Sequence, residues 1–171
     1  MAHNRVSIER IINALGYDFN AFTLPDFIQH LQHQRDRPIV VQGFPLSPTL
    51  FGMWIPAPTA DYILYNDRLH AIHQIHTILH ELAHVLLDHS CYRIDQILSP
   101  DLLRELGGTP FTARMRTAEP VGDPEQEAEA ELFVDIIQGQ LLRVQRLDRL
   151  YRGQSSVPLF RPYADGMGFE S

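Results

Sequence analysis

Apolar residues recur every three or four positions near the start of the chain, which is the spacing of one face of an amphipathic helix. This spacing predicts a first helix over residues 7–15 and a second over residues 22–34. Ser7 and Thr23 are expected to cap these helices, because their hydroxyls can accept from backbone N–H groups in the first turn. Pro25 is tolerated there, since the first turn lacks helical partners for its N–H groups. Both helices are predicted to be structural.

The pattern then changes to short runs of β-branched and aromatic residues. Three such runs cover residues 38–42, 50–55 and 62–65, and turn-forming residues separate them. Three successive strands with short connections predict a small, mainly antiparallel, three-stranded sheet. Because helices precede and follow these strands, the predicted fold class is α+β.

Helical spacing returns in the second half of the chain. It predicts a core helix over residues 69–88 and a second long core helix over residues 124–151, with the sheet packed on both. Residues 95–106 are expected to be partly helical. Glycine and proline residues predict a loop over residues 107–124 and an irregular C-terminal tail over residues 154–171.

Length and composition fit one globular domain. The chain has 171 residues, of which 44% are hydrophobic and 20% charged, enough for one sizeable core. Residues 1–153 are expected to form this domain. Its N-terminal helices are expected within residues 1–36, its sheet within 37–66 and its core helices within 67–153.

Charge and cysteine content exclude several classes of protein. The net charge is −7, which disfavours a nucleic-acid-binding surface because phosphate contacts need a basic patch. A single cysteine, Cys91, cannot form a disulfide framework. The N-terminus lacks the apolar segment of a signal peptide, and no apolar run reaches the roughly 20 residues that span a bilayer. A soluble, cytoplasmic protein is expected.

The predicted core helix over residues 69–88 contains a His-Glu-x-x-His motif at residues 80–84. Residues four apart lie on the same face of a helix, so His80 and His84 can direct two imidazoles at one Zn²⁺ ion. Glu81 is rotated by roughly 100° from His80, which places its carboxylate beside the metal, where it can take a proton from water. An amphipathic core helix without a metal is the simpler alternative.

Histidines extend beyond the motif along the same broad face of the helix. The full stripe is His70, His73, His76, His80 and His84. Only the last pair encloses a glutamate correctly, so His70, His73 and His76 are expected to lie on a solvated face or to support ligands or substrate. His89 lies near the helix end and is not expected to be a ligand. Cys91 is expected to be a buried thiol, with binding to the metal as a minor alternative.

Two histidines leave zinc one protein ligand short, because catalytic zinc sites use three. No histidine follows His89, so a carboxylate from the glutamate-rich start of the long helix is expected to complete the set. Helical geometry places Glu127 at the edge of the buried arc, which makes it the first choice, with Glu131 and Glu125 as alternatives. Glu125 and Glu129 also fit a solvated helix start, where carboxylates offset the helix dipole.

Residues 60–137 resemble the ImmA/IrrE family of metallopeptidases. The family pattern is H-E-L-G-H-x-x-L-x-H on one helix and E-x-x-A-N-x-F-A on a later one. The first corresponds to HELAHVLLDH at residues 80–89, and the second to EAEAELFV at residues 127–134. In this alignment the family's ligand glutamate falls on Glu127, and its usual Asn or Asp falls on Glu131.

The chain departs from the family pattern at several positions. Ala83 stands where glycine is usual, and the Leu-Leu-Met-Pro that often follows the second motif is absent. Asp135 follows Glu131 by four residues, a spacing that resembles the ligand glutamate and its aspartate partner in gluzincins such as thermolysin. Glu131 therefore stays open as the third ligand.

The resemblance implies a zincin-like fold, Zn²⁺ as cofactor and an intracellular endopeptidase with Glu81 as general base. Family members act on helix-turn-helix transcriptional repressors, so such a repressor is the expected partner, with no direct binding to nucleic acid or membrane. One alternative is a catalytically weak or inactive zincin-fold protein that regulates a repressor by binding. Another is a housekeeping peptidase.

Overall fold

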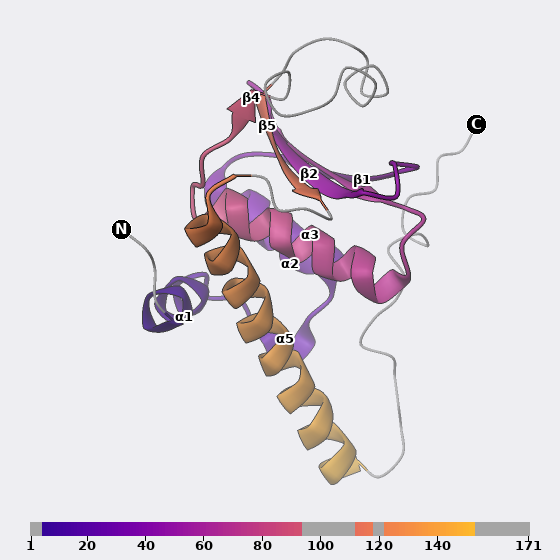
Figure 1. Cartoon of the computed structure of the whole chain (residues 1–171). Coiled ribbons are helices and arrows are strands. Elements are labelled where there is room, and N and C mark those ends of the chain that lie inside the picture. Colours follow the sequence, from indigo (N-terminus) through magenta and orange to yellow (C-terminus); the bar gives the residue numbers. More distant parts are fainter. Residues whose placement is uncertain (1–4, 94–111, 118–121, 153–171) are drawn as a thin grey trace, which may run out of the picture.

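The computed structural model describes residues 5–93, 112–117 and 122–152, with side chains up to residue 145 in the last helix (Figure 1). In these residues the helices are α1 (Arg5–Ala14), the 3-10 helix η1 (Phe19–Ala21), α2 (Leu24–Arg35), α3 (Ala71–Leu86) and α5 (Pro124–Arg152). The strands are β1 (Ile39–Phe44), β2 (Leu50–Pro56), β3 (Asp61–Asn66), β4 (Tyr92–Arg93) and β5 (Thr112–Thr117). These elements confirm the α+β class. The stretches predicted as a partial helix (95–106) and as a tail (154–171) lie outside the described residues.

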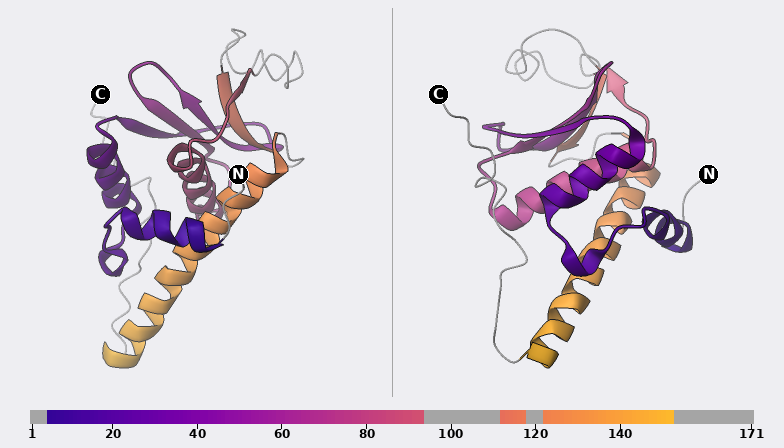
Figure 2. Two further views of the ribbon diagram at one scale, coloured as in Figure 1. Left: turned by 90° about the vertical axis from the view of Figure 1, so that its left-hand side faces the viewer. Right: turned by 180° about the vertical axis from the view of Figure 1, so that it is seen from behind.

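The sheet forms one layer of the molecule and the helices form the other. Figure 1 shows α2 and α3 on the same side of the sheet, and α3 contacts β2, β3 and α5. Figure 2 shows α1 beside α5, which it contacts, while the C-terminal half of α5 extends away from the sheet. The start of α5 therefore lies next to α3 and the sheet.

Capping signals predicted the start of α2 but not the start of α1. Thr23 caps α2, since its hydroxyl accepts from the backbone N–H of Asp26 at 3.3 Å. Ser7 lies inside α1, so the predicted cap at Ser7 is wrong. Gly16 follows the end of α1 with a φ of +62°, a left-handed conformation that glycine adopts without a Cβ penalty.

The sheet has five strands in the order β1-β3-β2-β5-β4, so the predicted three-stranded sheet is wrong. β1 pairs with β3 in parallel, whereas β2–β3, β2–β5 and β4–β5 are antiparallel. The sheet is therefore mainly antiparallel, as predicted. The three predicted strands are its first three neighbours, and β5 and β4 extend the sheet beyond β2.

The two missed strands lie where sequence patterns are weakest. β4 has only two residues, and β5 has the sequence Thr-Ala-Arg-Met-Arg-Thr between glycine- and proline-rich stretches. The strand shows no clear alternation of apolar and polar residues, because residues on both of its faces are buried. Ala113 and Met115 pack with Leu50 and Met53 in a small apolar cluster, whereas the buried Arg114 contacts residues of α3 and α5. A buried arginine on the core side made the strand resemble a polar loop.

α3 is the central helix of the main hydrophobic core. Ten of its 16 residues are buried, because the sheet covers one side of the helix and α5 covers another. The core includes Trp54 and Ile63 from the sheet, Leu79 from α3 and Phe133 from α5. The prediction that the motif helix is a core element is confirmed.

A buried carboxylate joins the sheet to the end of α2. Asp61 is 1% exposed and accepts from Arg37 Nε at 2.8 Å and from Trp54 Nε1 at 3.0 Å, with Arg35 at 3.5 Å. Substitution Asp61→Ala leaves a buried indole N–H without its acceptor and removes the carboxylate from two arginines, which keep backbone carbonyls as acceptors. The free energy of unfolding should fall by about 2–3 kcal/mol, below the usual cost of breaking a fully buried ion pair because both arginines are partly exposed.

Urea unfolding followed by circular dichroism measures this loss. The exposed Asp67 is the matched control, and Asp67→Ala should change stability by less than about 0.5 kcal/mol. Equal unfolding midpoints for the two variants would show that Asp61 does not stabilise the fold.

Candidate metal centre

The motif histidines lie side by side on the face of α3 that meets α5. His80 and His84 are each 1% exposed, and their Nε2 atoms are 3.0 Å apart. Their ring centroids are 4.7 Å apart, with the ring planes at 73°. Two adjacent imidazole nitrogens that point at one spot are the arrangement expected for two ligands of one ion.

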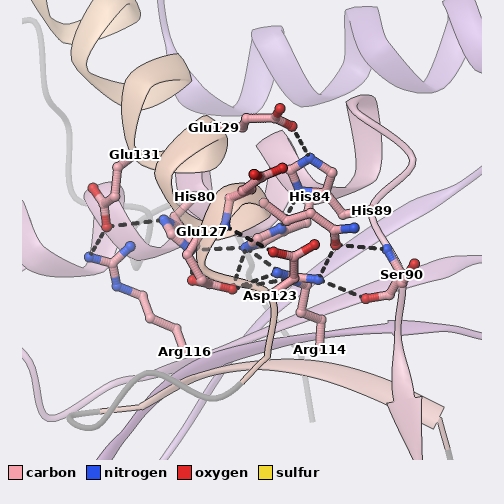
Figure 3. Close-up of polar contacts among 12 residues, drawn as sticks. His80, His84, His89, Ser90, Arg114, Arg116, Asp123, Glu127, Glu129 and Glu131 are labelled. Carbon is pink, nitrogen blue, oxygen red and sulfur yellow. Dashed lines mark hydrogen bonds and ion pairs between the residues drawn. The ribbon is translucent and has the colours of Figure 1, made fainter. Parts of the chain in front are cut away.

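The first turns of α5 bring Glu127 to the same spot (Figure 3). Its Oε2 is 3.2 Å from His80 Nε2, and its Oε1 is 3.6 Å from His84 Nε2. Ligands held tetrahedrally at 2.0–2.2 Å from a zinc ion are about 3.3–3.6 Å apart. The separations of 3.0, 3.2 and 3.6 Å are close to this range, so the three side chains are compatible with one bound metal ion.

The other glutamates of α5 lie in different surroundings. Glu131 pairs with Arg116 at 2.7 Å and with His76 at 3.1 Å. Its Oε1 is also 3.3 Å from His80 Nδ1, the ring nitrogen that faces away from Glu127. Glu125 is exposed. Of the three glutamates considered from the sequence, the structure brings Glu127 to the facing Nε2 atoms.

Glu81 lies one position after the first motif histidine and is completely buried. Neither oxygen of its carboxylate has a hydrogen-bond partner within the described residues. Burial raises the pKa of Glu81 to about 7. The backbone of Gly52 in β2 approaches this helix closely, and a Cβ there would collide with Thr77 and come within 3.5 Å of Glu81 Oε1. A buried carboxylate without a partner is rare and indicates a group kept available for a ligand or a proton.

Arg114 is a site residue that the sequence analysis missed. It is 1% exposed on β5, and its Nη2 donates to Glu127 Oε1 at 2.7 Å. Its Nη1 donates at 2.7 Å both to the Ser90 carbonyl and to Gln126 Oε1. Because Arg114 holds Oε1 of Glu127, Oε2 is left to face His80. The alternation of Ala113 and Met115 around it was the only sequence signal for this strand.

Opposing effects set the pKa values of the central residues. Burial alone would raise the pKa of Glu127, but hydrogen bonds from His80 and Arg114 lower it below the ordinary value. Burial lowers the pKa of His84, and the neighbouring cations lower it further. Burial would also lower the pKa of His80, but hydrogen bonds to Glu127 and Glu131 raise it. An ionised Glu127 and a neutral His84 are the protonation states that a metal ion requires.

A comparison with protein-family models gives a match over residues 38–133, more than half of the chain. The matching model is the IrrE N-terminal-like domain of the peptidase family M78. The chain belongs to this family. The match runs from the start of the sheet into α5 and so includes the motif helix, Arg114 and Glu127. The predicted membership of the ImmA/IrrE metallopeptidases is confirmed.

A search of curated proteins found no match to the chain. Among the described residues of this IrrE-like domain, no helix has the length and apolar character needed to cross a membrane.

The remaining histidines of the α3 stripe have separate contacts in this IrrE-like domain. His70 caps α3, since its Nδ1 accepts from the backbone N–H of Ile72 at 3.4 Å. His73 is exposed. Nε2 of His76 lies 3.1 Å both from Glu131 Oε2 and from Arg116 Nη2, and its Nδ1 lies 3.3 Å from the Gln138 side chain, so His76 packs beside a carboxylate next to the site.

Glu129 and Cys91 differ in burial from the sequence predictions. His89 and Glu129 are both buried and lie 2.9 Å apart, so the expected solvated position of Glu129 is wrong. Cys91 is half-buried, and burial raises the pKa of its thiol to about 12. Its sulfur is not part of the cluster formed by His80, His84 and Glu127.

Proposed function

We propose that this chain is a zinc-dependent endopeptidase in which His80, His84 and Glu127 hold the metal and Glu81 is the general base. The observation that carries the proposal is the convergence of three ligand atoms beside a buried carboxylate, which has no hydrogen-bond partner in the part of the chain that the structure describes. The donor set fits zinc, because two imidazoles and one carboxylate leave one coordination position open. A bound Zn²⁺ supplies a Lewis acid that lowers the pKa of water and polarises a carbonyl group.

The chain's own residues would handle the proton and the orientation of the ligands. A base with a pKa of about 7 can take a proton from water and return it to the leaving amine near neutral pH. Arg114 fixes one oxygen of Glu127 and leaves the other facing the histidines. Gly52 leaves room for Glu81 against β2.

For the substrate, we propose a helix-turn-helix transcriptional repressor, cleaved in the cytoplasm. This proposal rests on the family to which the chain belongs. The net charge of −7 also favours a protein substrate over direct binding to nucleic acid.

The test is to incubate the zinc-loaded protein with purified candidate repressors and to measure intact masses over time. Cleavage at one bond by the unchanged protein, but not by a Glu81→Gln variant, would support the proposal. A stable complex without fragments would instead favour regulation by binding. Cleavage of unrelated peptides but of no repressor would favour a general peptidase.

A further inference from the structure

His84 has a further partner at Nδ1, the ring nitrogen on the far side from His80. This atom lies 2.7 Å from Nδ1 of His89, and Nε2 of His89 lies 2.9 Å from a carboxylate oxygen of Glu129. His84 is 1% exposed, and His89 and Glu129 are 6% exposed. Figure 3 shows this line of side chains beside the metal centre. Because buried polar groups are costly unless satisfied, the three residues form one connected unit.

Protons can be placed on this unit in one consistent way when both rings are neutral. The carboxylate of Glu129 accepts, so Nε2 of His89 carries a proton. A neutral imidazole has one N–H, so Nδ1 of His89 is an acceptor and Nδ1 of His84 must donate to it. The lone pair of His84 is then on Nε2, the atom that faces His80 and Glu127.

Arg114 leads to the same proton placement from the other side of the ring. Its Nε lies 3.2 Å from Nε2 of His84. The single N–H of Arg114 Nε is shared with Glu127 Oε1, also at 3.2 Å, and because a guanidinium nitrogen only donates, Nε2 of His84 is the acceptor in this contact. Two contacts on opposite sides of one imidazole therefore favour the same tautomer.

The end of α3 brings His89 into this position. Asp88 has a φ of 53°, so the chain turns sharply after the helix. The backbone N–H of His89 then donates to the carbonyl of His84 at 3.0 Å, and the two ring centroids are 5.0 Å apart. Glu129 comes from α5, which also supplies Glu127, so one helix carries both carboxylates.

We propose that His89 and Glu129 are positioning residues that hold His84 in the tautomer with a proton on Nδ1 and the lone pair on Nε2, the nitrogen that would bind the metal. This inference rests on the proposed metal centre. Residues that orient a metal-binding histidine through its second nitrogen fix both its tautomer and the direction of its ring. Their loss weakens metal binding while the ligands themselves stay in place.

The test compares His89→Leu with His89→Asn, two side chains of similar size. The Asn oxygen can accept from Nδ1 of His84, whereas Leu cannot. The zinc dissociation constant, measured by competition with a chelator, should rise by about 10–100-fold for His89→Leu and stay close to native for His89→Asn. The control is Glu125→Ala, which changes an exposed residue of α5 and should leave zinc affinity unchanged.

Nitrogen-15 NMR of the imidazoles gives a readout that does not need the metal. His84 should be the Nδ1–H tautomer in the metal-free native protein and in His89→Asn, and should become mixed in His89→Leu. If His89→Leu fails to fold, Glu129→Gln and Glu129→Leu make the same comparison one residue further from His84. Native zinc affinity and an unchanged tautomer in the folded Leu variants would overturn this proposal alone. Absence of zinc binding by the unchanged protein would overturn the metal centre and this proposal together.

Discussion

Substitution Glu81→Gln is expected to abolish peptide hydrolysis while zinc stays bound. Gln has the shape of Glu but cannot accept a proton, and general-base catalysis contributes about 10²–10⁴-fold to the rate. The side chain is completely buried, and among the described residues neither oxygen has a hydrogen-bond partner, so the substitution breaks no hydrogen bond there. Turnover with a cleaved repressor should therefore fall by at least about 10²-fold.

Two measurements separate loss of the base from loss of structure. Zinc content and the thermal unfolding midpoint should match those of the unchanged protein. Glu125→Gln is the matched control, because Glu125 is exposed on α5, and its turnover should be native. Native turnover in the Glu81 variant would show that another group accepts the proton.

The second large effect is expected when the carboxylate that faces both histidines is removed. Glu127→Ala should abolish stoichiometric zinc, because only two protein ligands remain. Zinc affinity should fall by more than the factor of about 10–100 that is expected when an orienting residue is removed. Metal analysis of the purified protein after dialysis against a weak chelator measures this loss.

Glu127→Ala also leaves Arg114 buried without its carboxylate, which destabilises the fold. Glu127→Gln is the companion variant, since the amide oxygen can still accept from Arg114 but is a poorer ligand. Glu131→Ala should keep stoichiometric zinc with weaker affinity, and Glu125→Ala should behave like the unchanged protein. Loss of zinc from Glu131→Ala but not from Glu127→Ala would move the third ligand to Glu131.

Periodic patterns predicted the parts of the fold that bury one continuous face. The apolar stripes of α2 and α5 and the apolar run of α3 allowed these helices to be recognised in the sequence, because each packs on a broad hydrophobic surface. β5 was not legible. Its core side carries Arg114, whose burial makes sense only once Glu127 and Gln126 are known to lie opposite it.

The candidate site residues that the structure brings together, His80, His84 and Glu127, were the first choices from spacing on their helices. Spacing on one helix was enough to choose His80 and His84, since residues four apart must share a face. On α5, spacing favoured Glu127 but left Glu131 and Glu125 open as ligands, and it did not predict the burial of Glu129. Their partners come from other elements: Arg114 from β5 faces Glu127, and His89 from the turn after α3 faces Glu129.

X-ray absorption at the zinc edge of the purified protein tests the central claim most directly. The account predicts one zinc per chain, bound by two imidazole nitrogens at about 2.0–2.1 Å and by oxygen at about 2.0–2.2 Å. His84→Ala leaves only two protein ligands and should therefore lose stoichiometric zinc, as Glu127→Ala does. A sulfur neighbour at about 2.3 Å, which would come from Cys91, or a protein that holds no stoichiometric zinc, would contradict the account.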